Sequence, residues 1–384
     1  MELIFWIFIS IGICLCFFYF FLITKYCYGW IKTKEVEPGV DSAVYASVIV
    51  AARNEEKVLE NCINSILAQD YSRENFEIII VDDHSDDSTS QIILDYSKKY
   101  KQIKYLQLPE TKIGKKKAIH AAIEIAKGEL IITTDADCEM GTKWLSRIIS
   151  FYTQTNSKMI VGAVAFHKEK SLFEKMQSLE FLALMASGAG SLYFNKAIMC
   201  NGANLAYAKS VYLEVGGFAE IEEKASGDDV LLMYKIREKY PKGIQFLKSE
   251  EAVVFTKAKE KLADFIQQRK RWASKGFFAL NIETQRVSLL IYLFNFYLVF
   301  MPLIGGLLFL NTPFYLFFLQ LCFILVGIKC FIDFLLLFLS ASFFKKKRFL
   351  LLFLPEQIIY MIYVVLLGLL GSIGKYEWKG RKIN

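Results

Sequence analysis

Residues 47–52 read Ser-Val-Ile-Val-Ala-Ala, and similar short β-branched runs return at 76–81 as Phe-Glu-Ile-Ile-Ile-Val and at 130–134 as Leu-Ile-Ile-Thr-Thr. Such runs are typical of strands that are buried on both faces of a sheet. A fourth run lies at 103–108, and segments with apolar residues at helical spacing separate the four runs. Strands that alternate with helices predict an α/β fold with a mostly parallel, Rossmann-like sheet and right-handed crossovers.

The two ends of the chain are more apolar than its middle. Hydrophobic residues make up 54% of the 384 residues, whereas a soluble domain has about 45–50%. No charged residue occurs from 3 to 23, and further apolar stretches lie at 287–310, 314–344 and 349–373. Each is long enough to cross a membrane as a helix. This pattern argues against a disordered chain, a collagen and a plain soluble enzyme.

Positive charges predict the orientation in the membrane. Three lysines follow the first apolar stretch and a basic cluster occupies 345–348, which favours a cytoplasmic middle region and an uncleaved N-terminal anchor in the inner membrane. The basic tail at 375–382 then lies outside, unless Pro355-Glu356-Gln357 marks a re-entrant or interfacial segment. Both alternatives stay open. We expect Asp333, inside the second C-terminal stretch, to face protein or water rather than lipid.

Charge and cysteine content limit the partners. The chain has 46 Lys+Arg and 39 Asp+Glu, a formal net charge of +7. This modest surplus suits anionic lipids or phosphorylated substrates, and no nucleic-acid partner is expected. The 8 cysteines and 3 histidines show no spacing typical of disulfide frameworks or zinc sites.

Polar residues follow three of the predicted strands directly. They are Arg53-Asn54-Glu55, Asp82-Asp83 and Asp135-Ala136-Asp137. Ligands of parallel sheets bind beyond the carboxyl ends of the strands, so these segments are expected to share one site. Paired carboxylates suit Mg²⁺ together with substrate phosphates. The alternative is that they are ordinary solvated acidic turns.

Several predicted helix beginnings carry polar residues. Ser88 with Gln91 predicts a capping box. Gly114 followed by Lys115-Lys116-Lys117 suits an anion at a helix N-terminus, although it is neither a Walker A loop nor a dinucleotide-binding fingerprint. Gly227-Asp228-Asp229 has more carboxylates than a helix start needs, which favours a general base. An amphipathic basic stretch with Gln268-Arg269-Lys270-Arg271-Trp272 precedes the C-terminal spans and suits a membrane interface.

These motifs, in this order, resemble the membrane-bound family 2 glycosyltransferases of the cellulose, hyaluronan and poly-N-acetylglucosamine synthase-like kind. The resemblance covers roughly 47–272 plus the flanking spans, and it implies a GT-A nucleotide-sugar-binding fold flanked by transmembrane helices. It implies Mg²⁺ or Mn²⁺ at Asp135 and Asp137, and catalysis by Asp229 with Asp228. The implied donor-binding residues are Ala51, Arg53, Glu55, Asp82, Asp83, Lys115, Asp135, Gln268, Arg271 and Trp272.

Some positions depart from the family pattern. His120 stands where Asn is usual, and the base motif begins Gly-Asp rather than Thr-Glu. Cys200–Asn204 lies where these enzymes have a small-residue acceptor loop, so the resemblance implies that this segment contacts the acceptor. The predicted division is a transmembrane helix, a linker, a cytoplasmic GT-A catalytic domain, an interfacial segment, about three transmembrane segments and a basic tail, at 1–25, 26–45, 46–258, 259–285, 286–374 and 375–384.

The implied reaction is an inverting transfer from a nucleotide-sugar, with a UDP-sugar as the expected donor, to a growing polysaccharide at the membrane. A single transfer to a lipid acceptor (ceramide, diacylglycerol or polyprenyl phosphate) is the alternative. A membrane protein whose carboxylates bind a cation without catalysis is a third hypothesis. Phosphoryl transfer lacks any supporting motif.

Overall fold

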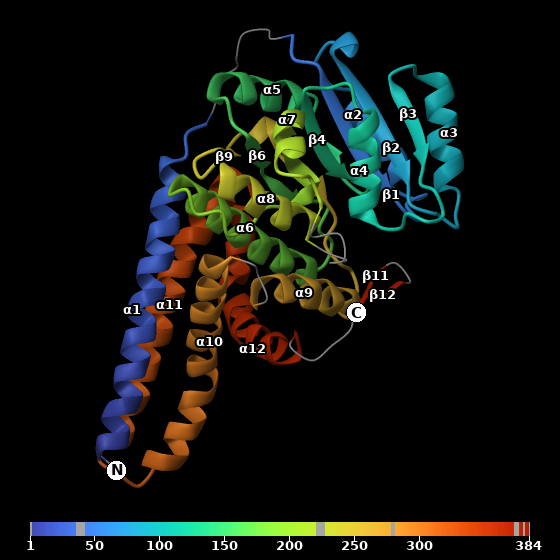
Figure 1. Ribbon diagram of the computed structural model, residues 1–384. Coiled ribbons are helices and arrows are strands. Elements are labelled where there is room, and N and C mark those ends of the chain that lie inside the picture. The colour runs from blue at the N-terminus through green and yellow to red at the C-terminus, as the bar shows by residue number, and fades with distance from the viewer. Residues whose placement is uncertain are drawn as a thin grey trace.

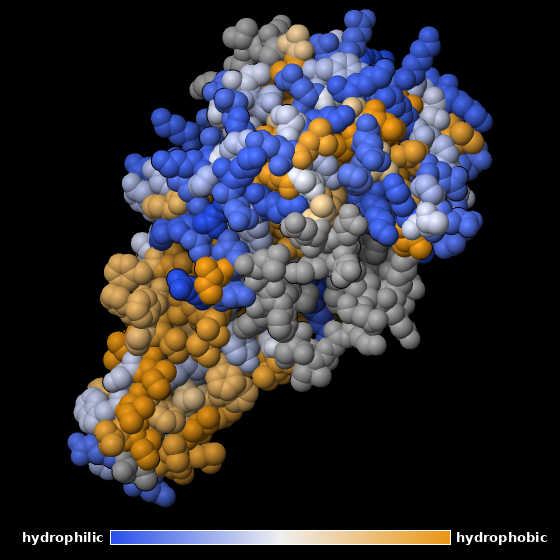
Figure 2. Space-filling view, in the orientation of Figure 1, coloured by the Kyte–Doolittle hydropathy of each residue, from blue (hydrophilic) through white to orange (hydrophobic). Residues whose placement is uncertain are grey.

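The computed structural model describes residues 2–35, 43–219, 227–277, 281–371, 376–378 and 381–383. An α/β domain lies on top of an elongated helical bundle (Figure 1). Hydrophobic residues cover the visible face of the bundle and hydrophilic residues cover much of the α/β domain (Figure 2). The uneven composition of the chain therefore corresponds to two distinct parts of the molecule.

A seven-stranded sheet forms the centre of the α/β domain, in the order β3-β2-β1-β4-β8-β6-β9. The strands β1, β2, β3 and β4 are mutually parallel, as predicted. Strand β8 runs antiparallel to both neighbours, and β9 is parallel to β6. The strand bounds are β1 Ala46–Ala52, β2 Phe76–Asp82, β3 Ile103–Gln107, β4 Leu130–Asp135, β6 Met159–Gly162, β8 Leu205–Ala208 and β9 Ile244–Leu247.

Helices cover the sheet, and a small second sheet in the order β5-β10-β7 borders it. Because β1, β2 and β4 are buried almost throughout, the apolar runs that predicted them are explained. The bounds are α2 Leu59–Leu67, α3 Thr89–Lys99, α4 Lys115–Ile125, α5 Trp144–Thr155, α6 Leu172–Tyr193, α7 Lys209–Glu214, α8 Asp228–Lys239, β5 Glu139–Met140, β7 Val164–Phe166 and β10 Val254–Thr256.

The capping box predicted at Ser88 is wrong. The Ser88 side chain makes no cap hydrogen bond. Instead, the carboxylate of Asp87 accepts from the Thr89 N–H at 3.0 Å, and Glu56 accepts from the Ser88 N–H at 3.1 Å. Carboxylates from the preceding turn and from a neighbouring loop thus take over the capping role. A complete capping box opens α6, between Ser171 and Glu174.

Within the described residues, four helices are long and apolar enough to cross a membrane. They are α1 Glu2–Lys32, α10 Ile282–Phe309, α11 Tyr315–Phe343 and the stretch that ends in α12 Phe353–Gly371, which follows the 3₁₀ helix η4 Lys347–Leu352. The helix α9 Leu262–Phe277 lies between α12 and the α/β domain (Figure 1). Helix α1 continues beyond the predicted span and reaches the α/β domain.

The bundle and the α/β domain are joined by close contacts. At the crossing of α1 and α6, a Cβ on Gly29 would overlap the carbonyl oxygen of Gly190. The Lys248 ammonium donates to the carbonyl oxygen of Trp30 at 3.0 Å, near the end of α1. Lys346, just after α11, pairs with Glu169 of the α/β domain. These contacts fix the bundle against the site described below.

Asp333 faces the protein interior, as expected. It is 8% exposed, pairs with Lys329 at 2.7 Å and accepts a hydrogen bond from the Tyr19 hydroxyl at 2.7 Å. The charge is therefore balanced within the bundle, by a lysine one helical turn earlier.

Candidate active site

A cavity of about 500 Å³ lies between the carboxyl ends of the parallel strands, α6, α8, α9 and the helical bundle. Almost every residue predicted for the site lines it. The predicted residues in its wall are Ala51, Arg53, Glu55, Asp83, Lys115, Asp135, Asp137, Asp228, Asp229, Gln268, Arg271 and Trp272. Residues that are up to 221 positions apart in the sequence are thus brought together around one space.

Asp82 is the exception. It is buried and does not line the cavity. Its carboxylate accepts hydrogen bonds from the hydroxyls of Ser85 at 2.5 Å and Ser90 at 2.6 Å. Asp82 therefore shapes the loop after β2, and the expectation that it contacts the donor is not supported by its position.

Asp83 points to the opposite side of that turn, into the cavity. Its carboxylate accepts from the Gly114 N–H at 3.0 Å, and its carbonyl oxygen accepts from Arg53 at 3.1 Å. Burial raises the pKa of the Asp83 carboxyl, against the lowering effect of the Gly114 N–H and Arg53. Gly114 has a φ of 108°, a conformation that favours glycine. The loop before α4 is thus held against the carboxyl end of β2.

Asp135 and Asp137 form a candidate metal site. One ligand atom from each of them and from Cys138 lie within 4.8 Å of one another. Burial, with the charges of both aspartates, raises the pKa of the Cys138 thiol well above its usual range. Hard divalent cations prefer oxygen ligands to sulfur, so the two carboxylates are the candidate donors of this site. Oxygen donors suit Mg²⁺ and Mn²⁺.

Lys115 connects the metal candidates to the base candidates. Its ammonium lies 2.5 Å from Asp135 and 3.6 Å from Asp228. Burial alone would lower the pKa of Lys115, but these carboxylates raise it above the usual lysine value. The lysine is therefore a fixed positive charge between two acidic groups at the beginning of α4.

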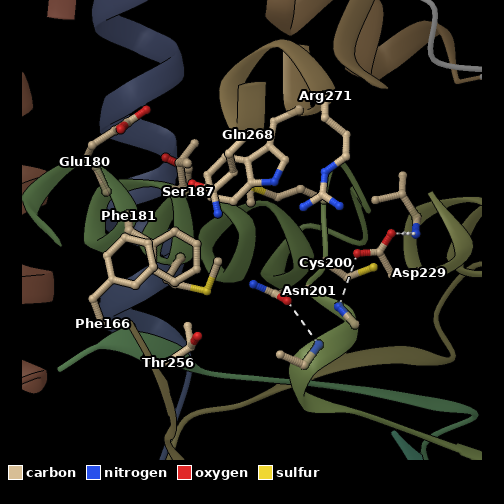
Figure 3. A pocket seen from close by; sticks show the side chains of 18 of the residues that line it. Phe166, Glu180, Phe181, Ser187, Cys200, Asn201, Asp229, Thr256, Gln268 and Arg271 are labelled. Carbon is tan, nitrogen blue, oxygen red and sulfur yellow. Dashed lines mark hydrogen bonds between the residues drawn. The ribbon is translucent and has the colours of Figure 1, made fainter. Parts of the chain in front are cut away.

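Asp229 belongs to the first turn of α8, which Gly227 opens with a φ of 89°. Its carboxylate accepts a hydrogen bond from the Gly202 N–H at 3.1 Å. Gly202 lies in the Cys200–Asn204 segment, where the Asn201 side chain accepts from the Ala203 N–H at 3.0 Å. The predicted acceptor loop and the predicted base are thus in direct contact (Figure 3).

The residues Gln268, Arg271 and Trp272 extend from α9 into the cavity. Figure 3 shows the Arg271 guanidinium directed towards Asp229. Arg269, between them in the sequence, stacks on the Trp272 ring at 4.2 Å and pairs with the buried Glu180 of α6. This pair anchors the motif, because its cation and its carboxylate come from different helices.

Some wall residues carry no signal that motif analysis detected. Phe166 and Phe181 stack with ring centroids 4.6 Å apart beside the cavity, with Ser187 and Glu180 nearby (Figure 3). The membrane end of the wall contains Tyr19, Asp333, Glu356, Gln357 and Tyr360. The charged residues inside apolar stretches were the available signal for that end.

Comparison with known proteins agrees with this geometry. The description Glycosyl transferase family 2 matches residues 47–216, which contain the parallel strands, the metal candidates and the acceptor loop. The chain carries a family 2 glycosyltransferase domain. The expected GT-A-like fold and the expected resemblance to the membrane-bound family 2 glycosyltransferases are confirmed.

Among relatives, the probable glycosyltransferase YdaM of Bacillus subtilis (strain 168) is 25% identical over 282 residues, or 70% of this chain and 65% of that protein. Poly-beta-1,6-N-acetyl-D-glucosamine synthase of Staphylococcus epidermidis (strain RP62A) is 25% identical over 258 residues, covering 65% and 60%. Beta-monoglucosyldiacylglycerol synthase of Trichormus variabilis is 29% identical over 128 residues, covering 33% and 26%. Each match spans less than two thirds of the relative's own length.

Among solved structures, the mannosyltransferase PcManGT from Pyrobaculum calidifontis, in complex with GDP-Man and Mn²⁺, superposes with a TM-score of 0.56. The superposition covers 96% of this chain and 98% of the neighbour's chain, at 17% identity. The likeness concerns the fold.

Proposed function

We propose that the chain is an inverting glycosyltransferase that moves a sugar from a nucleotide-sugar, with a UDP-sugar as donor, to a hydroxyl group of an acceptor at the membrane. The observation that carries this proposal is the shared cavity, which brings the Asp83 loop, the paired aspartates and Asp229 together with the α9 motif. A cation-binding protein without catalysis would not need a further carboxylate in the same cavity, in contact with the Cys200–Asn204 segment.

In this proposal the donor lies along the carboxyl ends of β1, β2 and β4. Ala51, Arg53, Glu55 and Asp83 surround the nucleoside, and Asp82 contributes by holding the loop. Lys115 and Arg271 offset negative charge on the diphosphate, while Gln268 and Trp272 close the space from the α9 side. Positive groups that are already in place stabilise a leaving diphosphate at no reorganisation cost.

Asp135 and Asp137 would hold a divalent cation, Mg²⁺ or Mn²⁺. Their oxygens point to one space, and Lys115 occupies only part of it. Such an ion supplies Lewis-acid stabilisation of the leaving diphosphate. A fold neighbour crystallised with GDP-Man and Mn²⁺ is consistent with this chemistry.

Asp229 acts as the general base. It takes the proton of the acceptor hydroxyl, whose oxygen forms the bond to the anomeric carbon while the bond from that carbon to the diphosphate oxygen breaks. The nucleoside diphosphate leaves with the bonding electrons. One in-line displacement inverts the anomeric centre, so no second carboxylate is needed as a nucleophile.

The acceptor is either a growing polysaccharide or a single lipid. The relatives include proteins named for each kind of product, a poly-N-acetylglucosamine synthase and a monoglucosyldiacylglycerol synthase. We place the catalytic domain on the cytoplasmic side of the inner membrane, in a multi-pass protein, because the basic residues after α1 and α11 favour that orientation. Membrane lipids surround the bundle in this arrangement.

The test is a donor screen on the full chain in lipid nanodiscs with Mn²⁺, measured as released nucleoside diphosphate. We expect release with one class of UDP-sugar, and a loss of about 100-fold or more in Asp137→Asn through loss of the cation. Cys138→Ser serves as the matched control and should keep its metal affinity, because hard divalent cations prefer oxygen ligands to sulfur. If no nucleotide-sugar is turned over, or if Asp137→Asn keeps full activity, the proposal is wrong.

A further inference from the structure

The cavity does not end at the catalytic residues. Past Ser187 and the apolar side chains of α10 and α11, its wall continues to Tyr19, Asp333, Glu356, Gln357 and Tyr360 in α1, α11 and α12. On α1 the wall includes Tyr26 and Tyr19. Seven residues of helix correspond to about 10 Å of depth along the helix axis.

This inner end has a connected polar floor. Lys329 is fully buried and donates to Asp333 at 2.7 Å and to Gln357 at 2.8 Å. Tyr19 donates to the second oxygen of Asp333 at 2.7 Å. The floor thus joins three helices through hydrogen bonds that include a full ion pair.

Among the described residues, Glu356 has no ion-pair partner like the lysine that pairs with Asp333. It is 5% exposed and lines the cavity, and among the described residues its carboxylate accepts one hydrogen bond, from the amide of Gln357 at 3.1 Å. No ion pair of Glu356 occurs in this part of the chain. A buried carboxylate with unused acceptor capacity is costly unless a ligand group supplies hydrogen bonds.

Beyond the floor the bundle is closed by packing. An apolar cluster of Phe5, Ile9, Phe309, Phe318 and Cys322 fills the outer half. The helices approach so closely there that a Cβ on Gly12 would overlap Tyr297, and one on Gly305 would overlap Phe318. The wall of the cavity on α1 includes no residue before Tyr19. The described bundle therefore offers no continuation of the cavity to the far side.

Resting on the proposed function, we propose that this inner end is a closed acceptor chamber that receives one small hydroxyl-rich group, with Glu356 accepting from its hydroxyls. Because the floor is sealed, a glycan cannot pass through these helices, and each binding event adds one sugar before the product leaves as it entered. A total volume of about 500 Å³ also has to hold the donor, and such a volume is within the roughly 300–1,000 Å³ typical of a single ligand.

The hydroxyl-rich group has two sources, a lipid head group or the end of a short glycan. One arm of the experiment uses nanodiscs with diacylglycerol or its monoglucosylated form, with UDP-glucose. The other uses soluble β-1,6-linked N-acetylglucosamine oligomers, with UDP-N-acetylglucosamine. In the arm that reacts, mass spectrometry should find acceptors extended by a single sugar. A long product ladder at limiting enzyme would overturn the closed chamber.

Glu356→Gln tests the floor without breaking an ion pair. We expect the acceptor KM to rise about threefold or more, since a hydrogen bond to the bound group is weakened, while the affinity for UDP stays as in the wild type. Asp333→Asn should also raise the acceptor KM. Glu169→Gln is the matched control for Asp333→Asn, because the Glu169 side chain is also buried and lysine-paired but lies outside the cavity.

An unchanged acceptor KM in both Glu356→Gln and Asp333→Asn would overturn the chamber. This failure is distinct from failure of the proposed function. If Asp137→Asn and Asp229→Asn abolish transfer but the floor variants do not change the acceptor KM, only the chamber is wrong. If the aspartate variants keep activity, the proposed reaction itself is wrong.

Discussion

Asp228 and Asp229 are neighbours in the chain but face different groups. Asp228 lies 3.6 Å from the Lys115 ammonium, whereas Asp229 accepts from the Gly202 N–H of the candidate acceptor loop. Two adjacent residues at the start of a helix point in directions about 100° apart. The two side chains can therefore contact different groups around the cavity. The donor side and the acceptor side therefore each receive one carboxylate.

The two aspartates should accordingly respond differently to removal of their charge. Asp229→Asn is expected to lower kcat by roughly 100- to 10,000-fold, because it removes the proton acceptor. Asp228→Asn is expected to raise the donor KM more than it lowers kcat, because it alters the charge around Lys115. Steady-state kinetics with the donor varied measures both. Equal effects of the two variants on kcat would contradict the assignment.

Glu77 shows how a charged residue can belong to the core of the sheet. It lies in β2 and accepts from the Ser47 hydroxyl at 2.7 Å and from the Lys127 N–H at 2.6 Å, and it pairs with Lys104 at 2.6 Å. Burial alone would raise the pKa of Glu77, but these hydrogen bonds lower it. Its ionised form therefore stabilises the junction of neighbouring strands.

The pH dependence of stability follows from the lowered pKa of Glu77. Its contribution is present above the unfolded value, about 4.3, and is lost as the pH falls through the lower folded value. Glu77→Gln should thus reduce the apparent Tm at pH 7, and the difference from the wild type should shrink below about pH 4. Thermal unfolding across pH measures this. Glu124→Gln, on an exposed side chain, is the control and should shift little.

At the scale of elements, the crossing of α1 and α6 positions the bundle against the catalytic domain. Gly29 and Gly190 let the two backbones touch, and a side chain at either position would overlap the partner helix. The same two helices contribute Tyr19, Glu180 and Ser187 to the wall of the cavity. A change at the crossing should therefore alter both stability and activity.

Gly29→Ala is expected to destabilise the protein by about 1–3 kcal/mol, the usual cost of overpacking. The matched control is Gly327→Ala in α11, where a Cβ would meet nothing within 4 Å. Apparent Tm in nanodiscs compares the two variants. A Gly29→Ala protein as stable as the control would show that the helices can separate without cost.

At the scale of the whole molecule, the bundle is asymmetric. Helices α1, α10 and α11 extend far from the catalytic domain, whereas α12 lies beneath α9 (Figure 1). The 19 residues of α12 span about 28 Å, and the short strand β11 Tyr376–Trp378 lies against α9. We infer that α12 does not carry the chain across the membrane, which removes the conflict between the basic tail and the distribution of positive charge.

A sidedness experiment tests this inference. An epitope tag after the last residue and a tag inserted at Asn156, in an exposed turn of the catalytic domain, should be accessible from the same side of sealed membrane vesicles. Antibody binding before and after permeabilisation measures it. Opposite accessibility of the two tags would mean that α12 spans the membrane.

The sequence alone was sufficient for the parallel half of the sheet and for the four apolar helices, because these depend on local periodicity and length. It also placed the charged segments correctly at the carboxyl ends of the strands. The Ser88 cap was wrong because carboxylates from neighbouring turns satisfied the helix start instead. Asp82, at the end of β2, does not line the cavity, because successive residues of an extended chain direct their side chains to opposite sides, which the motif does not reveal.

Only the tertiary structure decided how far the cavity extends. Glu180, Lys329 and Glu356 belong to three helices, and although the last two stand out as charges in apolar stretches, their local sequence does not indicate that they lie near one space. The pairing of the antiparallel strand β8 was also not predictable from local sequence, because it joins β8 to β4 across about 75 residues of the chain. Periodicity reports which face of an element is buried, but the identity of the partner on that face is set by packing between distant segments.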